Sequence, residues 1–257
     1  MIHLQSIKKV NRQVHNPKFP FDTPIIEHFR ELQLTNPVTI LVGENGSGKS
    51  TLLETIAMNS GSIWVGSDRE NSSLSQEVEG LLKMSWKVKT QRGFYFRASD
   101  FNLFIHKLKE EKRFSLEMIE EIKREGRNQL ETMPYARTLA DLQRLYGAGL
   151  EHRSHGESFL DLFQARFKEN SFYILDEPEA PLSPQKQLSF LSLLKQMVSE
   201  NGQFLIATHS PMIMAFPGAT IYQVEGGQLV QTSYEELEHV TITRDFLQAP
   251  ERFFRYL

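Results

Sequence analysis

The sequence has 257 residues, of which 40% are apolar and 24% charged, with a formal net charge of −3. This composition is typical of a globular chain and excludes wholesale disorder, and the absence of cysteine excludes disulfides and thiolate metal sites. We expect a cytoplasmic protein with no signal peptide in residues 1–10 and no direct membrane insertion, because no apolar run approaches the ~18 residues of a spanning helix.

The chain is predicted to begin with two strands before a first helix. Residues 1–10 favour a strand, and residues 11–24, which contain three prolines, favour a loop. The β-branched run at residues 37–42 follows a turn signal and predicts a buried strand. A glycine-rich turn leads from this strand into a predicted helix over residues 51–58.

Residues 61–149 are predicted to form a small inserted helical subdomain. Residues 61–80 are polar and serine-rich and favour a loop, whereas residues 94–97 favour a short strand. Ser99 is a candidate cap for the next helix, and residues 107–132 are charged and helical in pattern. Two amphipathic surface helices would describe residues 107–132 equally well. The helix after Ser99 is predicted from one apolar face at helical spacing, formed by Phe101, Phe104, Ile105 and Leu108.

The remaining segments alternate between strand and helix signals. Ser183 before Pro184 predicts a helix start, and Ser233 with Glu236 predicts a capping box for a last helix. The glycine pair at 226–227 is a hairpin signal. Apolar runs predict strands at residues 171–175, 204–208, 220–224 and 228–232. This alternation predicts an α/β fold with a mostly parallel central sheet.

The glycine-rich turn at residues 43–50 matches the phosphate-binding P-loop pattern, with a strand before it and a helix after it. Its glycines let the backbone curl, and the N–H groups at the helix N-terminus attract an anion. We expect Lys49 to reach the β- and γ-phosphates of ATP and the Ser50 hydroxyl to bind Mg²⁺. The predicted nucleotide-binding residues of this turn are Gly43, Glu44, Asn45, Gly46, Ser47, Gly48, Lys49, Ser50 and Thr51.

Two carboxylates, Asp176 and Glu177, follow the predicted strand at residues 171–175. Ligands bind at the carboxyl ends of buried parallel strands, so Asp176 is expected to help hold Mg²⁺. Glu177 is the expected catalytic residue that polarises the attacking water. A pair of solvated acids is the alternative, and the neighbouring P-loop disfavours it.

His209 follows the predicted strand at residues 204–208. A histidine at this edge of the sheet can hydrogen-bond the γ-phosphate and the attacking water. With Lys49 and Glu177 it forms the predicted catalytic set. The other histidines are expected to be ordinary surface or core residues.

These three strand ends, in this order, resemble those of the ATP-binding-cassette ATPases. Residues 153–158 precede the strand that carries the two acids, and they resemble the Ser-Gly-Gly-Gln signature of that family. Ser154 and Gly156 match, whereas His155 and Glu157 replace the first glycine and the glutamine. A plain helix cap would explain this segment alone equally well.

The resemblance spans about residues 34–230. The residues of these motifs are most similar to those of the RecF and chromosome-maintenance branch, which includes small bacterial predicted ATPases. It implies a P-loop NTPase fold in a single domain 1–257, with a core at 1–60 and 150–257 and the helical insert at 61–149. It also implies an ATP-sandwiched homodimer, in which each site receives Ser154 and Gly156 from the other copy. We expect a partner to respond to this cycle through the insert.

Two positions of the family pattern are not clearly matched. Gln91 precedes the strand at residues 94–97 and Arg97 ends it, and we favour Arg97 as the glutamine-loop residue that contacts the nucleotide. Phe19 and Phe21 are the candidates for stacking on adenine, and packing of their own loop explains them equally well.

Several functions remain open. The motif wording favours an ATPase that acts as a switch or motor with nucleic acid, in repair or defence, or with another protein complex. The alternative is the ATP-binding subunit of a membrane transporter, against which stand the altered signature, Glu44 in the P-loop and the unclear glutamine loop. A third class is a binding switch with slow hydrolysis, which Glu177 and His209 disfavour. A P-loop kinase would leave the signature segment and the segment around His209 without a role.

Overall fold

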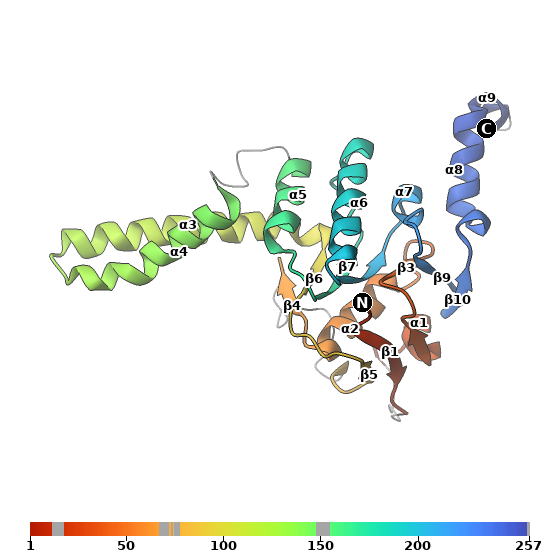
Figure 1. The fold of residues 1–257 in the computed structure, drawn as a ribbon, viewed down its shortest axis with the longest axis horizontal. Coiled ribbons are helices and arrows are strands. Elements are labelled where there is room, and N and C mark those ends of the chain that lie inside the picture. Colours follow the sequence, from red (N-terminus) through yellow and green to blue (C-terminus); the bar gives the residue numbers. More distant parts are fainter. Residues whose placement is uncertain (12–17, 67–71, 73, 75–77, 148–154, 256–257) are drawn as a thin grey trace.

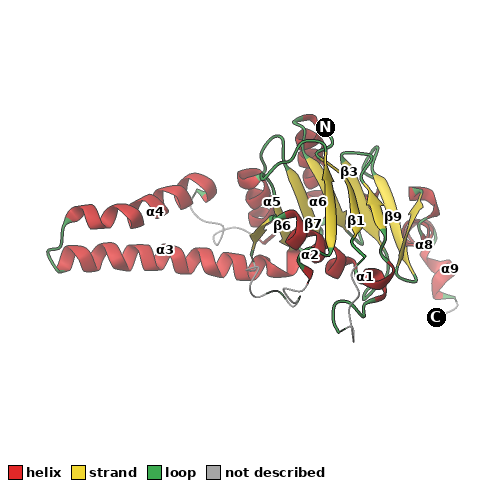
Figure 2. Ribbon diagram, turned by 90° about the horizontal axis from the view of Figure 1, so that it is seen from below, coloured by secondary structure: helices red, strands yellow, loops and turns green. Residues whose placement is uncertain are grey.

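A computed structural model describes residues 1–11, 18–66, 72, 74, 78–147 and 155–255. Strands and helices form a layered body, from which a long helical hairpin projects at one end (Figure 1). The C-terminal helices stand away from the opposite end of the body. Figure 2 shows the same body from below, with the hairpin again projecting from one end.

The centre of the described part of the chain is a seven-stranded sheet with the order β10-β9-β3-β8-β7-β6-β4. All neighbours are parallel except β10, which pairs with β9 as an antiparallel hairpin. Every residue of β3, β7 and β8 is buried, as expected for parallel strands covered on both faces. The strands are β3 (Val38–Val42), β4 (Ile63–Val65), β6 (Phe94–Arg97), β7 (Phe172–Asp176), β8 (Gln203–Ala207), β9 (Thr220–Glu225) and β10 (Gln228–Thr232).

A second, antiparallel sheet has the order β2-β1-β5. Its strands are β1 (Leu4–Lys9), β2 (Glu31–Gln33) and β5 (Leu82–Trp86). The fully buried Gln203 of β8 joins it to the central sheet, because its Oε1 accepts hydrogen bonds from the backbone N–H groups of His3 and Leu4 at 2.8 Å each. Its Nε2 donates to the Leu4 carbonyl at 2.8 Å, so each polar atom of this buried amide has a partner.

The two faces of the central sheet pack against different helices. In β3, Val38, Ile40 and Val42 belong to the core beneath α5, α6 and α7, whereas Leu41 belongs to the core beneath α1 and α2. This alternation follows the two-residue period of a strand. The helices of the body are α1 (Pro24–His28), α2 (Lys49–Ser60), α5 (His155–Arg166), α6 (Pro184–Ser199), α7 (Pro211–Met214), α8 (Glu238–Gln248) and α9 (Pro250–Phe254).

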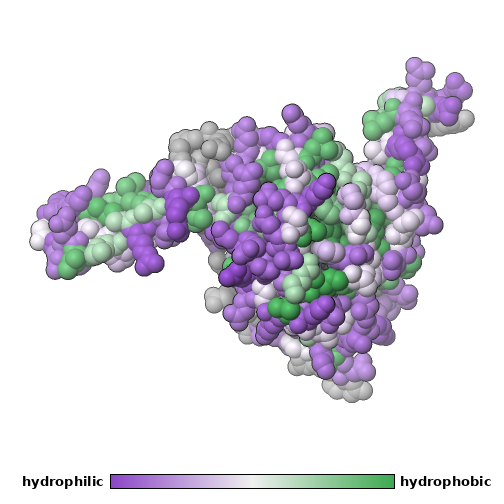
Figure 3. Space-filling model, viewed as in Figure 1, coloured by the Kyte–Doolittle hydropathy of each residue, from purple (hydrophilic) through white to green (hydrophobic). Residues whose placement is uncertain are grey.

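The projecting hairpin consists of α3 (Phe101–Arg124), the short turn η4 (Gln129–Thr132) and α4 (Met133–Tyr146). The 24 residues of α3 extend over about 36 Å at the usual helical rise. Its base is anchored in the core, where Phe101 and Phe104 are buried and Ile105 and Leu108 pack alongside, as the predicted apolar face requires. Farther out, apolar side chains lie open to solvent (Figure 3), among them Phe114, Leu130 and Met133.

The structure confirms the predicted α/β fold class, with a mostly parallel sheet and a helical element between the P-loop and the signature segment. It also confirms a strand within each segment predicted as one, and the hairpin around residues 226–227. The predicted first helix is longer than expected, because α2 begins directly at Lys49.

Other local predictions were wrong. The predicted loop at residues 61–80 contains β4, a short edge strand. Ile63 in this strand is exposed, so the strand does not show the apolar pattern of a buried strand. No side-chain cap begins α3, because Ser99 lies in the 3-10 turn η3 (Ala98–Asp100) before it. The predicted Ser233–Glu236 capping box is present, but it begins the 3-10 turn η6 (Tyr234–Glu236), and α8 starts after that turn.

The predicted insert at residues 61–149 is not uniformly helical. β4 and β6 pair within the central sheet, and β5 pairs with β1 in the smaller sheet. Among the described residues of this segment, α3, η4 and α4 are the part that extends away from the body. The division of the chain into core and insert stays a prediction. Among the described residues of the predicted insert, the α-helices are those of the hairpin.

Candidate functional site

Several loops meet at the carboxyl edge of the central sheet. The register pairs Arg97 of β6 with Asp176 of β7, and Asp176 with Ala207 of β8, so these strands end at the same level. The P-loop follows β3, which is the neighbour of β8. The carboxyl edge of a parallel sheet is where ligands bind in such folds, and each predicted catalytic side chain lies there.

The P-loop turns sharply because two of its glycines adopt left-handed backbone angles. The φ angle is 79° at Gly46 and 91° at Gly48, a region that L side chains rarely occupy. A Cβ atom on Gly48 would also lie 2.4 Å from Cγ2 of Ile25 in α1. Glycine at this position therefore lets the turn fit against α1 and directs the N-terminus of α2 at the site.

Lys49 is buried at the start of α2 and bends back over the P-loop. Its Nζ donates to the carbonyl oxygens of Gly43 at 2.8 Å and Glu44 at 2.9 Å. Burial lowers the pKa of Lys49, while the nearby carboxylates of Glu177 and Asp176 raise it in part. The ammonium group is thus held within the turn, where an anionic ligand could take the place of the two carbonyls.

Asp176, at the end of β7, is only 1% exposed. Burial raises its pKa to about 6. The Ser50 hydroxyl and the Arg97 guanidinium lower this pKa, but burial has the larger effect. Its Oδ1 is buried without a hydrogen-bond partner within bonding distance among the described residues, although Ser50 lies near. A free carboxylate oxygen beside a hydroxyl fits Mg²⁺, which prefers oxygen ligands and takes few of them from protein.

No cluster of three or more histidine, cysteine or acidic side chains suited to a metal occurs within the described ranges. A Mg²⁺ ion at Ser50 and Asp176 would therefore depend on phosphate oxygens and water for its remaining ligands. The residues present fit a metal that arrives together with a nucleotide.

Glu177 follows Asp176 and has an unusual backbone conformation. Its φ angle is 52°, in the left-handed region, and its N–H donates to the Ala207 carbonyl at 2.8 Å. Non-glycine residues in this region cost of order 1 kcal/mol or more and concentrate at functional sites. The turn leaves the Glu177 side chain 45% exposed and directs it toward His209, with Oε1 3.7 Å from Nε2.

His209 is held by Glu179, a residue that the sequence patterns did not single out. Oε1 of Glu179 accepts the His209 backbone N–H at 2.6 Å. Burial lowers the pKa of His209, and Lys49 lowers it further, while Glu177 raises it. The lowered pKa favours the neutral imidazole, which can donate a hydrogen bond from one ring nitrogen and accept one at the other. The sequence signal that could have identified Glu179 is its position, two residues after Glu177 in the same loop.

Arg97 lies beside the predicted metal position, whereas Gln91 does not. Gln91 precedes β6 and so lies toward the amino edge of the parallel sheet, away from the P-loop. Arg97 ends β6 and forms ion pairs with Asp176 and with Glu54 of α2. Glu54 was missed because nothing in its local sequence distinguishes it from other helix residues.

Two adjoining cavities lie at the P-loop. One of about 720 Å³ is lined by the loop together with Phe19, Glu177 and His209. The other, of about 310 Å³, is lined by Ser50, Glu54 and Arg97 among others. Of the two predicted adenine-stacking candidates, Phe19 is exposed at the larger cavity, whereas Phe21 is buried in the core.

The predicted signature segment lies only partly within the described residues. Ser154 is outside them, and Gly156 lies in the first turn of α5. A Cβ atom on Gly156 would lie 3.0 Å from the Pro181 carbonyl, so the start of α5 packs closely against the loop after Glu177. No described residue of α5 lines either P-loop cavity.

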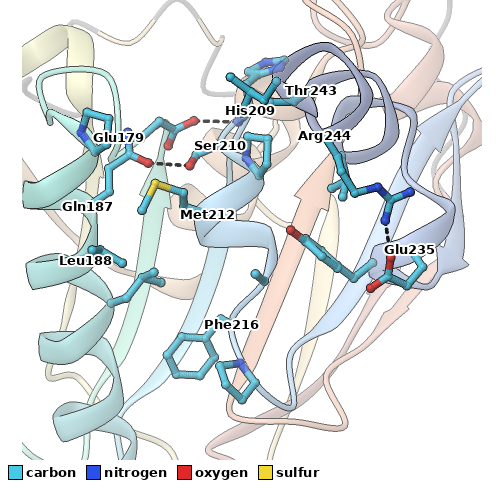
Figure 4. A pocket seen from close by; sticks show the side chains of 18 of the residues that line it. Glu179, Gln187, Leu188, His209, Ser210, Met212, Phe216, Glu235, Thr243 and Arg244 are labelled. Atoms are coloured by element: carbon cyan, nitrogen blue, oxygen red, sulfur yellow. Dashed lines mark hydrogen bonds and ion pairs between the residues drawn. The ribbon is translucent and has the colours of Figure 1, made fainter. Parts of the chain in front are cut away.

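A third and larger cavity of about 1300 Å³ lies between α6, α7 and α8 (Figure 4). It is lined largely by apolar side chains, including Leu188, Met212 and Phe216, and reaches Glu179 and His209 at one end. Ser210 donates to Oε1 of Gln187 at 2.6 Å, which ties the segment after β8 to α6.

Two family models match the sequence. The model described as ABC transporter matches residues 34–180, more than half of the chain, and the model described as AAA ATPase domain matches residues 155–214. The cobalt import ATP-binding protein CbiO of Salmonella paratyphi A is 23% identical over 240 residues, or 88% of this chain and 84% of its own. A putative ABC transporter ATP-binding protein of Methanosarcina acetivorans is 31% identical over 180 residues, or 66% of this chain and 62% of its own.

Solved structures share the fold. The ATP-binding cassette of an ABC transporter has a TM-score of 0.52 and 14% identity, covering 96% of this chain and 98% of that one. An Smc head domain from Pyrococcus furiosus has a TM-score of 0.53 and 13% identity, covering 96% and 100%. The fold alone therefore does not separate the two kinds of protein. Among the helices that the structure describes, none combines the length and apolarity needed to cross a membrane.

Proposed function

The chain belongs to the ABC transporter family and is an ATPase of that type, and we propose that it binds Mg·ATP in the larger P-loop cavity. The single observation that carries this proposal is the convergence of Lys49, Glu177 and His209 on that cavity. Glu177 and His209 follow two different strands and Lys49 begins α2, yet all three line one cavity.

In the proposed complex, the backbone N–H groups of the P-loop bind the phosphates and Lys49 exchanges its two carbonyl partners for β- and γ-phosphate oxygens. Ser50 and Asp176 would hold Mg²⁺, which would neutralise phosphate charge. Phe19 lies where it can contact the base. Arg97 remains beside Asp176 rather than in contact with the base.

Glu177 orients the attacking water and accepts its proton, while neutral His209 hydrogen-bonds the γ-phosphate. The water oxygen forms a bond to the γ-phosphorus as the bond to the β-phosphate oxygen breaks, which yields ADP and inorganic phosphate. Each residue lies on a strand end that the sheet fixes, so positioning supplies much of the effect.

We propose that the working unit is a head-to-tail dimer with ATP at the interface. Gly156 and the other described residues of α5 line neither P-loop cavity, which supports a role for this helix at the site of a second copy. Ser154 and Gly156 are the contacts that the family resemblance implies there. There the N-terminus of α5 would face the γ-phosphate. Light scattering of the Glu177→Gln chain is expected to show a doubled mass with Mg·ATP and the single-chain mass with ADP.

For the partner, we propose a membrane transporter subunit, with this chain as its ATP-binding subunit at the cytoplasmic side. The support is the family model and the similarity to proteins named as transport ATP-binding proteins. The test compares ATP hydrolysis with and without double-stranded DNA, and follows the Glu177→Gln chain in membranes of its source cells. We expect no effect of DNA and ATP-dependent retention on membranes.

A second candidate is a switch or motor for a nucleic-acid-linked or other protein complex, in the RecF and chromosome-maintenance branch. It is favoured by the AAA ATPase domain match at residues 155–214 and by the projecting hairpin with its open apolar side chains. Hydrolysis that DNA stimulates and that Glu177→Gln abolishes, without membrane retention, would favour this candidate over the transporter subunit.

A further inference from the structure

Arg97 joins two buried carboxylates beside the nucleotide cavity. The strand register places it next to Asp176. Its Nη2 donates to Oε2 of Glu54 at 2.5 Å, and its Nε donates to Oδ2 of Asp176 at 3.2 Å. One guanidinium group thus connects the P-loop helix α2 with the end of β7.

The burial of this trio makes its charge balance important. The side chains of Glu54 and Asp176 are 4% and 2% exposed, and that of Arg97 is 29% exposed. An ionised carboxylate buried without a counter-charge is strongly unfavourable. A guanidinium group stays protonated in proteins, so Arg97 supplies a permanent positive charge between these two carboxylates.

The chemistry of a guanidinium excludes Arg97 as a metal ligand, because it has five N–H donors and no acceptor atom. Arg97 nevertheless lines the 310 Å³ cavity together with Ser50, Glu54 and Asp176. A divalent cation held by Ser50 and Asp176 would lie close to this positive charge. Two such cations repel each other, and the repulsion is stronger beside buried groups than in bulk water.

Each oxygen of Asp176 has a different environment. Oδ2 accepts from Arg97, whereas Oδ1 has no partner within bonding distance in the described part of the chain. The carboxylate can therefore serve the guanidinium and a metal at the same time, with one oxygen for each. Glu54 gives the guanidinium a second anchor that a metal at Asp176 would not remove.

We propose that Arg97 is a built-in counter-cation that shares Asp176 with Mg²⁺ and so sets the Mg²⁺ concentration at which nucleotide is bound. It is a positioning residue that acts through Asp176, and Glu54 retains it in the cavity and offsets its charge. This inference rests on the proposed function, in which Ser50 and Asp176 hold the metal.

The test is a Mg²⁺ titration of the binding of a fluorescent ATP analogue to the full chain. Arg97→Gln is expected to lower the half-saturating Mg²⁺ concentration about fivefold or more, because it removes a competing charge. Glu54→Gln is expected to raise it by a similar factor. The double variant restores the charge balance and is expected to return close to the parent value.

Two controls isolate this effect from general damage. Arg92→Gln removes an exposed arginine just before the same strand, at the opposite edge of the sheet, and is expected to change nothing. Arg97→Lys keeps the charge and is expected to stay near the parent value. If Arg97→Gln does not fold, the test depends on Glu54→Gln, for which the half-saturating Mg²⁺ concentration must rise.

The outcomes separate the inference from the proposed function. If the parent chain binds the analogue and the two single variants shift in the same direction, or not at all, Arg97 is only structural and the inference is overturned. If the parent chain binds no analogue at any Mg²⁺ concentration, the proposed function fails and the inference fails with it. If the half-saturating Mg²⁺ concentration falls in Arg97→Gln, rises in Glu54→Gln and stays unchanged in Arg92→Gln, the result supports both the inference and the proposed function.

Discussion

Nε2 of His209 lies 3.7 Å from Oε1 of Glu177, although the two side chains follow different strands. β7 and β8 are parallel neighbours whose register extends to Asp176 and Ala207, so the next residues of both strands leave the sheet together. The Glu177 N–H bonds back to the Ala207 carbonyl and fixes the turn. An imidazole and a half-exposed carboxylate thus face one cavity, as the proposed hydrolysis requires.

Glu179 is expected to support catalysis through His209. Glu179→Ala removes the acceptor of the His209 N–H and should lower kcat about tenfold, the effect of losing roughly one hydrogen bond at the site. Glu179→Gln keeps an acceptor oxygen and should retain most of the rate. Steady-state hydrolysis measured beside nucleotide affinity checks this, and a fall in affinity with unchanged kcat would contradict it.

The P-loop glycines are expected to differ in their tolerance of a side chain. Gly48→Ala combines a left-handed φ with a Cβ 2.4 Å from Ile25, and should lower the free energy of unfolding by about 3 kcal/mol or more. Gly61→Ala, at the other end of α2, has a similar φ but open space, and should cost about 1 kcal/mol. Urea unfolding of both variants compares them directly, and equal losses would show that the contact with α1 is unimportant.

The buried Asp176 is expected to make stability depend on pH. Its pKa is raised from 3.8 to about 6 in the folded chain, so below about pH 4 both states hold the proton and above pH 6 the folded state must bury a charge. The free energy of unfolding should therefore decrease as pH rises between these values, by about 3 kcal/mol at most for this group.

Asp176→Asn isolates that contribution. With metal removed by EDTA, the variant should become more stable relative to the parent as pH rises from 4 to 7, measured by urea unfolding. Glu179, whose pKa burial also raises, is present in both chains and cancels in the comparison. A difference between the two chains that stays constant with pH would refute the role given to Asp176.

The parts of the site that the sequence predicts are those that depend on local pattern. The P-loop, Asp176, Glu177 and His209 each follow an apolar run that only a buried strand explains, and parallel strands bring such ends together. The Arg97–Glu54 pair joins residues from a strand and a helix that are far apart in the chain, and neither side chain lies in a pattern that requires the other. Such a contact follows from the order of strands in the sheet, which the sequence does not show.

The smaller sheet was missed for a related reason. β1, β2 and β5 are joined only by long-range antiparallel pairing. β5 alternates buried and exposed residues over a short span that contains lysine and serine, so its apolar signal is weak. Tertiary packing against α2 and the buried Gln203 completes that sheet, and neither can be read from the local sequence.

The most direct test of the central claim is the rate of ATP hydrolysis by the full chain and by Glu177→Gln. The account predicts a fall in kcat of roughly 10²-fold or more, the usual contribution of a positioned acid or base, with Mg·ATP affinity retained. Glu169→Gln, an exposed acid before the start of β7, serves as the matched control and should keep the parent rate. A Glu177→Gln chain that hydrolyses ATP as fast as the parent would contradict the account.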